Sequence, residues 1–165
     1  MAWRGVPFED TWIPVVKLEL LWFYAARYGS LGWIEWAHQC GFSRLWEEYR
    51  FEWEVQRIPI GKPMCAKAAR YGKLDALQLL RQHGCPWSSW TCRDAAEGGH
   101  LAVLQWAREN GCPWNEMTCA AAAKGGHLSC LQWARKNGCD WDKTTLLRYA
   151  KNCGKPDVLS YIIDN

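Results

Sequence analysis

The chain has 165 residues, enough for one domain that buries about two thirds of the surface exposed by its unfolded form. Its formal net charge of +3 and its isoelectric point near 8.4 are too mild to indicate a nucleic-acid or membrane-surface partner. No stretch approaches the roughly 18 apolar residues of a membrane-spanning helix, so we expect no membrane insertion.

The nine cysteines would suggest disulfides in a small secreted chain, but their number is odd. Most of them recur at two fixed positions of a repeat: Cys65, Cys92 and Cys119, then Cys85, Cys112 and Cys139. We therefore interpret them as small apolar packing residues. Together with the absence of a secretory signal pattern, this predicts an intracellular, cytoplasmic protein in a reducing compartment.

The first part of the chain is less regular than the rest. Residues 1–14 are predicted to form an N-terminal arm, and residues 15–41 a capping unit of two helices. Residues 42–61 are an insert that interrupts the regular spacing. Its pattern fits a helical face or an alternating strand, and we favour a helix that begins at Ser43 and ends before Pro59.

Residues 62–165 form four repeats, and three residue types recur in them with one shared period. These are Leu74, Leu101 and Leu128; Gly84, Gly111 and Gly138; Trp87, Trp114 and Trp141. Apolar residues at helical spacing predict helix pairs at about 62–84, 90–111, 117–138 and 144–165. Because each helix is short, each pair must bury its apolar stripe against the adjacent pairs.

Local signals within one unit support this division. Gly111 is predicted to end its helix in the left-handed conformation, and Pro113 prevents the helix from continuing. Thr118 is expected to cap the next helix. Residues 120–123 are alanines, and their small side chains allow a neighbouring helix to come close.

The run AAEGGHLAVL from Ala95 to Leu104, followed by GCPWN from Gly111 to Asn115, resembles an ankyrin repeat. The paired alanines, the Gly-His-Leu and the apolar second-helix positions correspond. Two features depart from the family: residues 91–94 read TCRD in place of Thr-Pro-Leu-His, and the period is 27 residues, against about 33 for ankyrin. The resemblance covers roughly residues 15–165. It is nearest to the short Trp- and Cys-rich arrays of giant viruses, algae and other protists.

This resemblance implies an all-α, ankyrin-like helix-turn-helix solenoid of about five repeats with truncated β-turn fingers. It also implies that the first helices line a concave side. Basic residues lie on those helices: Lys67, Arg70, Arg93, Lys124, Arg148 and Lys151. Asp94 and Glu97 interrupt them, which favours a solvated face of mixed charge over a nucleic-acid site.

The sequence offers little catalytic chemistry. His100 and His127 occupy the same repeat position, where we expect a hydrogen bond to the backbone at the turn between helices. No CxxC, HxxxH or HExxH motif is present, and no candidate nucleophile has an evident base. We therefore predict that the protein is not an enzyme and has no cofactor or metal.

Tryptophan is unusually abundant, with thirteen residues. Those at repeat positions are expected to be core residues that seal the space between units: Trp33, Trp36, Trp87, Trp106, Trp114, Trp133 and Trp141. Trp46, Trp53 and Trp90 lie outside these positions. With Tyr49 and Phe51, the insert carries an aromatic cluster that either contacts a partner or covers the first two units.

The functional prediction is a non-catalytic protein-protein interaction module or scaffold, monomeric by itself, and it rests partly on the resemblance. Its expected contact residues are Tyr71, Trp90, Arg93 and Met117 on the first helices and Trp46, Tyr49, Phe51 and Trp53 in the insert. The alternative is a structural subunit permanently integrated in a large multiprotein assembly.

Overall fold

The computed structural model describes residues 24–39 and 64–165, and every regular element in these ranges is a helix. The all-α prediction is confirmed for this part of the chain. The predicted arm at residues 1–14 and the insert at residues 42–61 lie outside the described residues.

The helices come in pairs, each made of a first and a second helix. The first helices are α5 (Met64–Arg70), α7 (Ser89–Glu97), α9 (Glu116–Gly125) and α11 (Lys143–Cys153). The second helices are α6 (Leu74–Gln82), α8 (Leu101–Glu109), α10 (Leu128–Lys136) and α12 (Pro156–Asp164). Before them, helical residues 24–28 precede α2 (Leu31–Gln39). The predicted pairs from residue 62 onward are confirmed to within two residues at each end.

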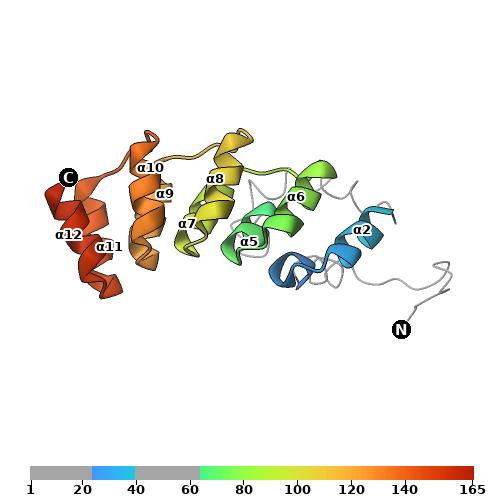
Figure 1. Cartoon of the computed structure of the whole chain (residues 1–165), viewed down its shortest axis with the longest axis horizontal. Coiled ribbons are helices and arrows are strands. Elements are labelled where there is room, and N and C mark those ends of the chain that lie inside the picture. The colour runs from blue at the N-terminus through green and yellow to red at the C-terminus, as the bar shows by residue number, and fades with distance from the viewer. Residues whose placement is uncertain (1–23, 40–63) are drawn as a thin grey trace, which may run out of the picture.

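The pairs are arranged in a row, with α2 near one end and α12 at the other (Figure 1). Each first helix packs against its own second helix and against the next first helix, in the order α5, α7, α9, α11. The second helices contact each other less extensively, through α2 with α6, α8 with α10 and α10 with α12. The loops that lead from each pair to the next run along the upper edge in Figure 1.

Side-chain size explains why the first helices contact one another so closely. Their paired alanines are fully buried: Ala68 and Ala69, Ala95 and Ala96, Ala122 and Ala123. An alanine allows two helix backbones to approach, whereas the second helices use bulkier residues such as Leu104 and Leu131 to fill the space beneath them. The apolar core is therefore continuous from one unit to the next.

The turn between the two helices of a pair contacts the backbone of the preceding unit. The Nε2 atom of His100 lies 3.1 Å from the carbonyl oxygen of Arg70, one unit earlier, which confirms the predicted backbone bond for this histidine. A Cβ atom on Gly98 would collide with that same carbonyl oxygen. Gly111, with φ of 81°, follows the end of α8 and lies in the left-handed region, as predicted.

The helix cap predicted at Thr118 is wrong. Helix α9 begins at Glu116, and the side chain of Asn115 accepts a hydrogen bond from the N–H of Met117 at 3.2 Å. Thr118 is instead buried inside the first turn. Asn and Asp cap helices more strongly than Thr does, and Asp142 caps α11 in the same manner.

The tryptophans at repeat positions are not fully buried, contrary to the prediction of sealed core residues. Trp33 is 52% exposed, and the others are half-buried at the edge of the core. Trp114 shows the reason. Its ring lies 4.2 Å from the Arg108 guanidinium of the preceding unit and 5.8 Å, edge to face, from Trp133 of its own unit. The ring joins neighbouring units, as expected, but does so at the surface.

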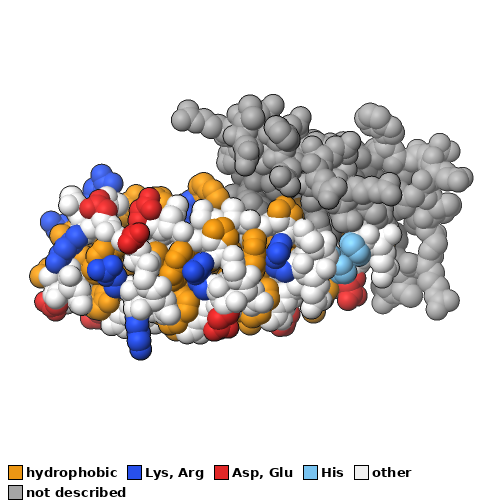
Figure 2. Space-filling model, turned by 90° about the horizontal axis from the view of Figure 1, so that it is seen from above, with side chains coloured by type: hydrophobic (Ala, Val, Ile, Leu, Met, Phe, Trp, Pro, Cys, Tyr) orange, Lys and Arg blue, Asp and Glu red, His pale blue; other side chains and the backbone are white. Residues whose placement is uncertain are grey.

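The same arrangement recurs along the row. Arg81 lies over Trp87, and Trp87 meets Trp106; Arg135 lies over Trp141, and Trp141 meets Tyr161. Seen from the side of the loops, hydrophobic and basic side chains alternate along the row (Figure 2). Because the arginines of the first two units also donate to loop carbonyls, at Cys85 and Cys112, we interpret this series as a structural connection between units.

Candidate functional site

The first-helix face, formed by helices α5, α7, α9 and α11 on the side away from the second helices, carries large exposed apolar side chains. Trp90 is 45% exposed and Met117 is 41% exposed. They occupy equivalent positions one unit apart, in the first turns of α7 and α9, and these two helices pack directly against each other. The prediction that both are surface residues is confirmed.

Arg93 and Tyr71, predicted as exposed contacts, are only partly exposed. The Arg93 guanidinium lies over the Trp90 ring at 4.2 Å and 3.8 Å from a carboxylate oxygen of Glu97. Tyr71 has the Arg27 guanidinium 4.9 Å from its ring centroid. Both side chains are held in place by these neighbours. They therefore flank the exposed residues and are not themselves exposed contact residues.

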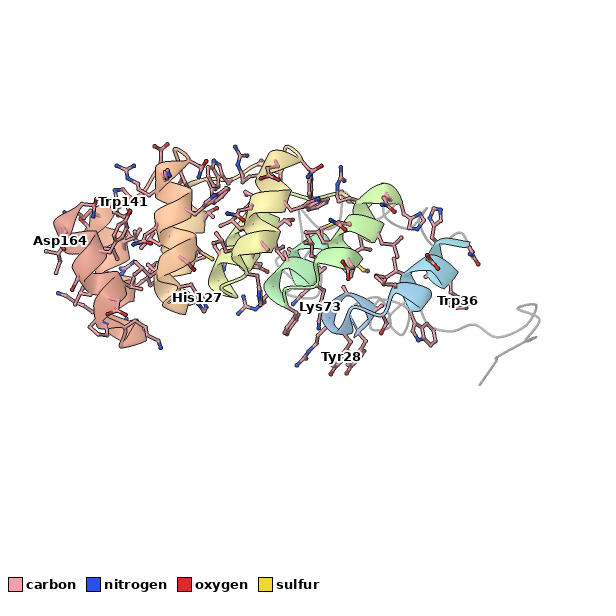
Figure 3. All side chains as sticks on the ribbon, in the orientation of Figure 1. Tyr28, Trp36, Lys73, His127, Trp141 and Asp164 are labelled. Atoms are coloured by element: carbon pink, nitrogen blue, oxygen red, sulfur yellow. The ribbon has the colours of Figure 1, made fainter. Side chains whose placement is uncertain are left out.

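A second aromatic cluster lies at the end of the face nearest α2. Tyr24 and Tyr28 stack with parallel rings 6.0 Å apart, and both are exposed. Arg27 lies between Tyr28 and Tyr71 and is within 5.5 Å of each ring centroid. Figure 3 shows Tyr28 at the same end of the helices as Lys73 and His127, opposite Trp141. This cluster is not among the predicted contacts, although Tyr28 and Tyr71 share one repeat position and could have indicated it.

The middle of the face is an ion-pair network centred on Glu97. Its carboxylate accepts hydrogen bonds from Arg70 at 2.7 and 3.3 Å and from Lys124 at 3.0 Å. The three residues come from α5, α7 and α9, so the network spans three units. Glu97 is partly buried, which disfavours its ionised form, but the bonds from Arg70 and then Lys124 overcome this and lower its pKa to about 2.

The ion-pair network shows whether the basic residues of the first helices form a continuous positively charged strip. Arg70 also lies 3.8 Å from a carboxylate oxygen of Asp94, so the basic residues at the centre of the face are paired with acids. The predicted interruption by Asp94 and Glu97 is confirmed. A continuous strip of cations suited to a phosphate backbone is not present among the described first helices.

Two histidines meet elsewhere, between α2 and α6. The rings of His38 and His83 stack with centroids 3.9 Å apart. Burial, followed by the charge of His38, lowers the pKa of His83 and favours the neutral ring. In the described ranges, 24–39 and 64–165, no three His, Cys, Asp or Glu side chains converge as metal ligands would.

The remaining predicted contacts, Trp46, Tyr49, Phe51 and Trp53, belong to the insert and lie outside the described residues. None of the described helices has the length and apolar character needed to cross a membrane. No protein-family model matches the sequence, and no curated protein is similar enough to count as a relative.

Proposed function

We propose that the chain is a non-catalytic protein-interaction module built as an ankyrin-like solenoid. Three observations support the architecture: the regular period, the pairing of each first helix with a second helix, and the packing of each unit on the next. The paired alanines and the Gly-His turn with its bond to the preceding unit support the resemblance to ankyrin repeats.

One observation carries the functional proposal: Trp90 and Met117 are exposed at equivalent positions in the first turns of two helices that pack directly together. Large apolar side chains on a rigid surface are typical of binding hot spots. Because the Glu97 network and the alanine contacts already fix the helices, little conformational freedom is lost when a partner binds.

The distribution of charge suggests the character of the partner. Among the described residues, the first helices carry eight Lys or Arg (Arg27, Lys67, Arg70, Arg93, Lys124, Lys143, Arg148, Lys151) and three Asp or Glu (Asp94, Glu97, Glu116). The second helices carry four basic residues (Arg81, Arg108, Arg135, Lys136) and five acidic ones (Glu35, Asp75, Glu109, Asp157, Asp164). A protein surface with apolar anchors and a surplus of carboxylates fits the first-helix face best.

Trp90→Ala tests this proposal, with Trp33→Ala as its matched control, because both tryptophans are about half exposed and only Trp90 lies on the first-helix face. Each variant and the unchanged chain would be used to enrich partners from the native lysate, after circular dichroism has shown that all three remain helical. We expect the partner to be lost with Trp90→Ala and kept with Trp33→Ala. Equal retention by both variants would contradict a site at Trp90.

A third protein, with residues 42–61 replaced by a short turn, tests the insert separately. If the partner is lost only in this protein, the insert is the recognition element and the first helices support it. The alternative of a permanent assembly subunit predicts a different result: the isolated chain would be poorly soluble, and its partners would co-purify in fixed proportion and resist high salt.

A further inference from the structure

The repeated cysteines form three pairs, one in each inner unit. The pairs are Cys65 with Cys85, Cys92 with Cys112, and Cys119 with Cys139. In each pair the first-helix thiol interacts with the second thiol, and its Sγ lies 3.7, 4.0 and 4.0 Å, respectively, from the second cysteine's carbonyl oxygen. The repeat relates cysteines of neighbouring units, whereas these contacts join two cysteines of the same unit.

The second cysteine of a pair lies at the start of its own unit's first helix. Cys112 follows α8, yet its Sγ is 3.5 Å from the carbonyl oxygen of Ser88, the residue that precedes α7. Cys139 has the same relation to Asn115, at 3.2 Å. Each pair therefore links the two ends of one helix pair.

In the two pairs that contain Cys112 and Cys139, the surroundings favour the ionised form of the second thiol. The thiol of Cys92, followed by the Thr91 hydroxyl and the backbone N–H of Cys92, lowers the pKa of Cys112 in spite of its burial. The thiol of Cys119 acts in the same manner on the pKa of Cys139. Cys130, which lies outside the pairs, shows the opposite behaviour, since burial raises its pKa to about 11.

Packing alone does not require cysteine at the first position of each pair. The position of Cys65, Cys92 and Cys119 in the repeat is filled by Leu146 in α11, and Leu146 is also buried. An apolar side chain is thus accepted there. What the inner units share is that both members of the pair are cysteine.

The pairs are buried but close to the surface. Cys112 is enclosed, yet its chain neighbours Gly111 and Pro113 are both exposed, in a loop without helical structure. A local opening of this loop, without unfolding of the helices, would bring the thiol into contact with solvent.

We propose that the three pairs are sites of oxidation, at which a peroxide converts the two thiols of each unit into a disulfide. The thiolate of Cys112 attacks one peroxide oxygen, the O–O bond breaks, and Cys112 becomes a sulfenic acid while the other oxygen leaves as water after taking up a proton. Cys92 then attacks the sulfenic sulfur, an S–S bond forms, and the second oxygen leaves as water. Two thiols are oxidised and one hydrogen peroxide is reduced to two waters.

Each disulfide would close a loop around a whole helix pair and restrict the unfolded chain. The oxidised protein is therefore expected to unfold at a temperature higher by roughly 5 °C or more than the reduced protein. This proposal does not depend on the identity of the binding partner.

Tryptic digestion tests the pairing directly, because cleavage after Lys and Arg places the two cysteines of each pair in different peptides. Cys65 falls in the peptide 58–67, Cys85 and Cys92 in 82–93, Cys112 and Cys119 in 109–124, Cys139 in 137–143, and Cys130 in 125–135. The full chain, first reduced, would be treated with hydrogen peroxide and digested without reducing agent. The proposal predicts that 58–67, 82–93, 109–124 and 137–143 are joined in one chain of four peptides, while 125–135 stays separate.

Cys92→Ala sharpens the result, since it should split that product into two halves, one holding 58–67 with 82–93 and the other 109–124 with 137–143. Cys130→Ala is the control and should leave the map unchanged. The proposal is overturned if 82–93 or 109–124 closes on itself, if 125–135 is cross-linked, or if no thiol is lost below the unfolding temperature.

Discussion

Replacement of Glu97 by glutamine is the sharpest test of the ion-pair network. The substitution keeps the size of the side chain and removes its charge, so Arg70 and Lys124 lose the carboxylate to which both donate. No apolar contact is deleted. The change in stability therefore reports on the network itself.

The expected size of the effect follows from the pKa of Glu97, which is lowered from 4.5 to about 2. At about 1.4 kcal/mol per pKa unit, this sets a ceiling of about 3 kcal/mol. The Glu97 side chain is only 10% exposed, but that of Lys124 is 55% exposed, so solvent weakens the interaction. We expect a loss of about 1–2 kcal/mol at pH 7, or roughly 3–6 °C in the unfolding midpoint.

The pH dependence gives a second check. Because the folded-state pKa is depressed, the contribution is complete above about pH 5, falls as the pH drops through the unfolded value near 4.5, and is lost below about 2. Urea unfolding of the wild type and Glu97→Gln at pH 7 and pH 3 should therefore show a difference that shrinks to less than about half. Glu109→Gln, on the exposed side of α8, is the control for loss of a charge and should have little effect. An equal difference at both pH values would refute the reasoning.

Four further substitutions test the turns and caps. Burial lowers the pKa of His100, so the folded protein favours the neutral ring. The fold should therefore lose stability as the pH falls below about 6.5. His100→Gln should remove part of this loss, as measured by urea unfolding at pH 7.5 and 5.5. Gly98→Ala should cost about 2 kcal/mol or more, because its Cβ would meet a backbone oxygen, whereas Gly111→Ala has open space and should cost about 1 kcal/mol for its positive φ. Asn115→Ala should cost about 1 kcal/mol in thermal unfolding through the lost cap of α9.

Each of these predictions would be contradicted by a specific result. A pH dependence unchanged by His100→Gln would show that other groups cause it. Equal losses for Gly98→Ala and Gly111→Ala would mean that the collision with the preceding unit does not matter. A neutral Asn115→Ala would show that solvent replaces the cap at no cost.

The helix pairs could be predicted because their signals are local and repeated. Gly111 ends a helix for reasons contained in its own backbone, and the same residue type marks the same place one unit earlier and later. The cap at Asn115 could also have been predicted, since Asn is a better cap than Thr118 and stands directly before the helix. The sequence therefore already contained the signal that identifies Asn115 as the cap.

The contacts between elements could not be predicted in the same manner, because they depend on distances that the repeat period does not give. The period alone does not tell that Cys92 meets Cys112 of its own unit in place of Cys65 or Cys119, its equivalents in the neighbouring units. The half-buried state of Trp114 likewise depends on an arginine from the preceding unit. Trp90 and Met117 could be predicted as surface residues because they do not belong to the apolar stripe, and that signal is again local.

The position of Glu97 also bears on binding. Arg27, Arg70, Glu97, Lys124 and Lys151 follow the second of two paired residues in successive units. With a cation in place of Glu97, like charges would face each other on neighbouring helices about 10 Å apart, at a cost of roughly 0.5–2 kcal/mol per pair before screening by salt. Glu97 replaces two repulsions by two attractions, and in doing so occupies Arg70 and Lys124. If the partner is acidic, Glu97→Gln should therefore weaken the fold and strengthen binding, because both cations become available. Titration of the enriched partner onto both proteins would measure this, and weaker binding by the variant would show that the partner does not use these cations.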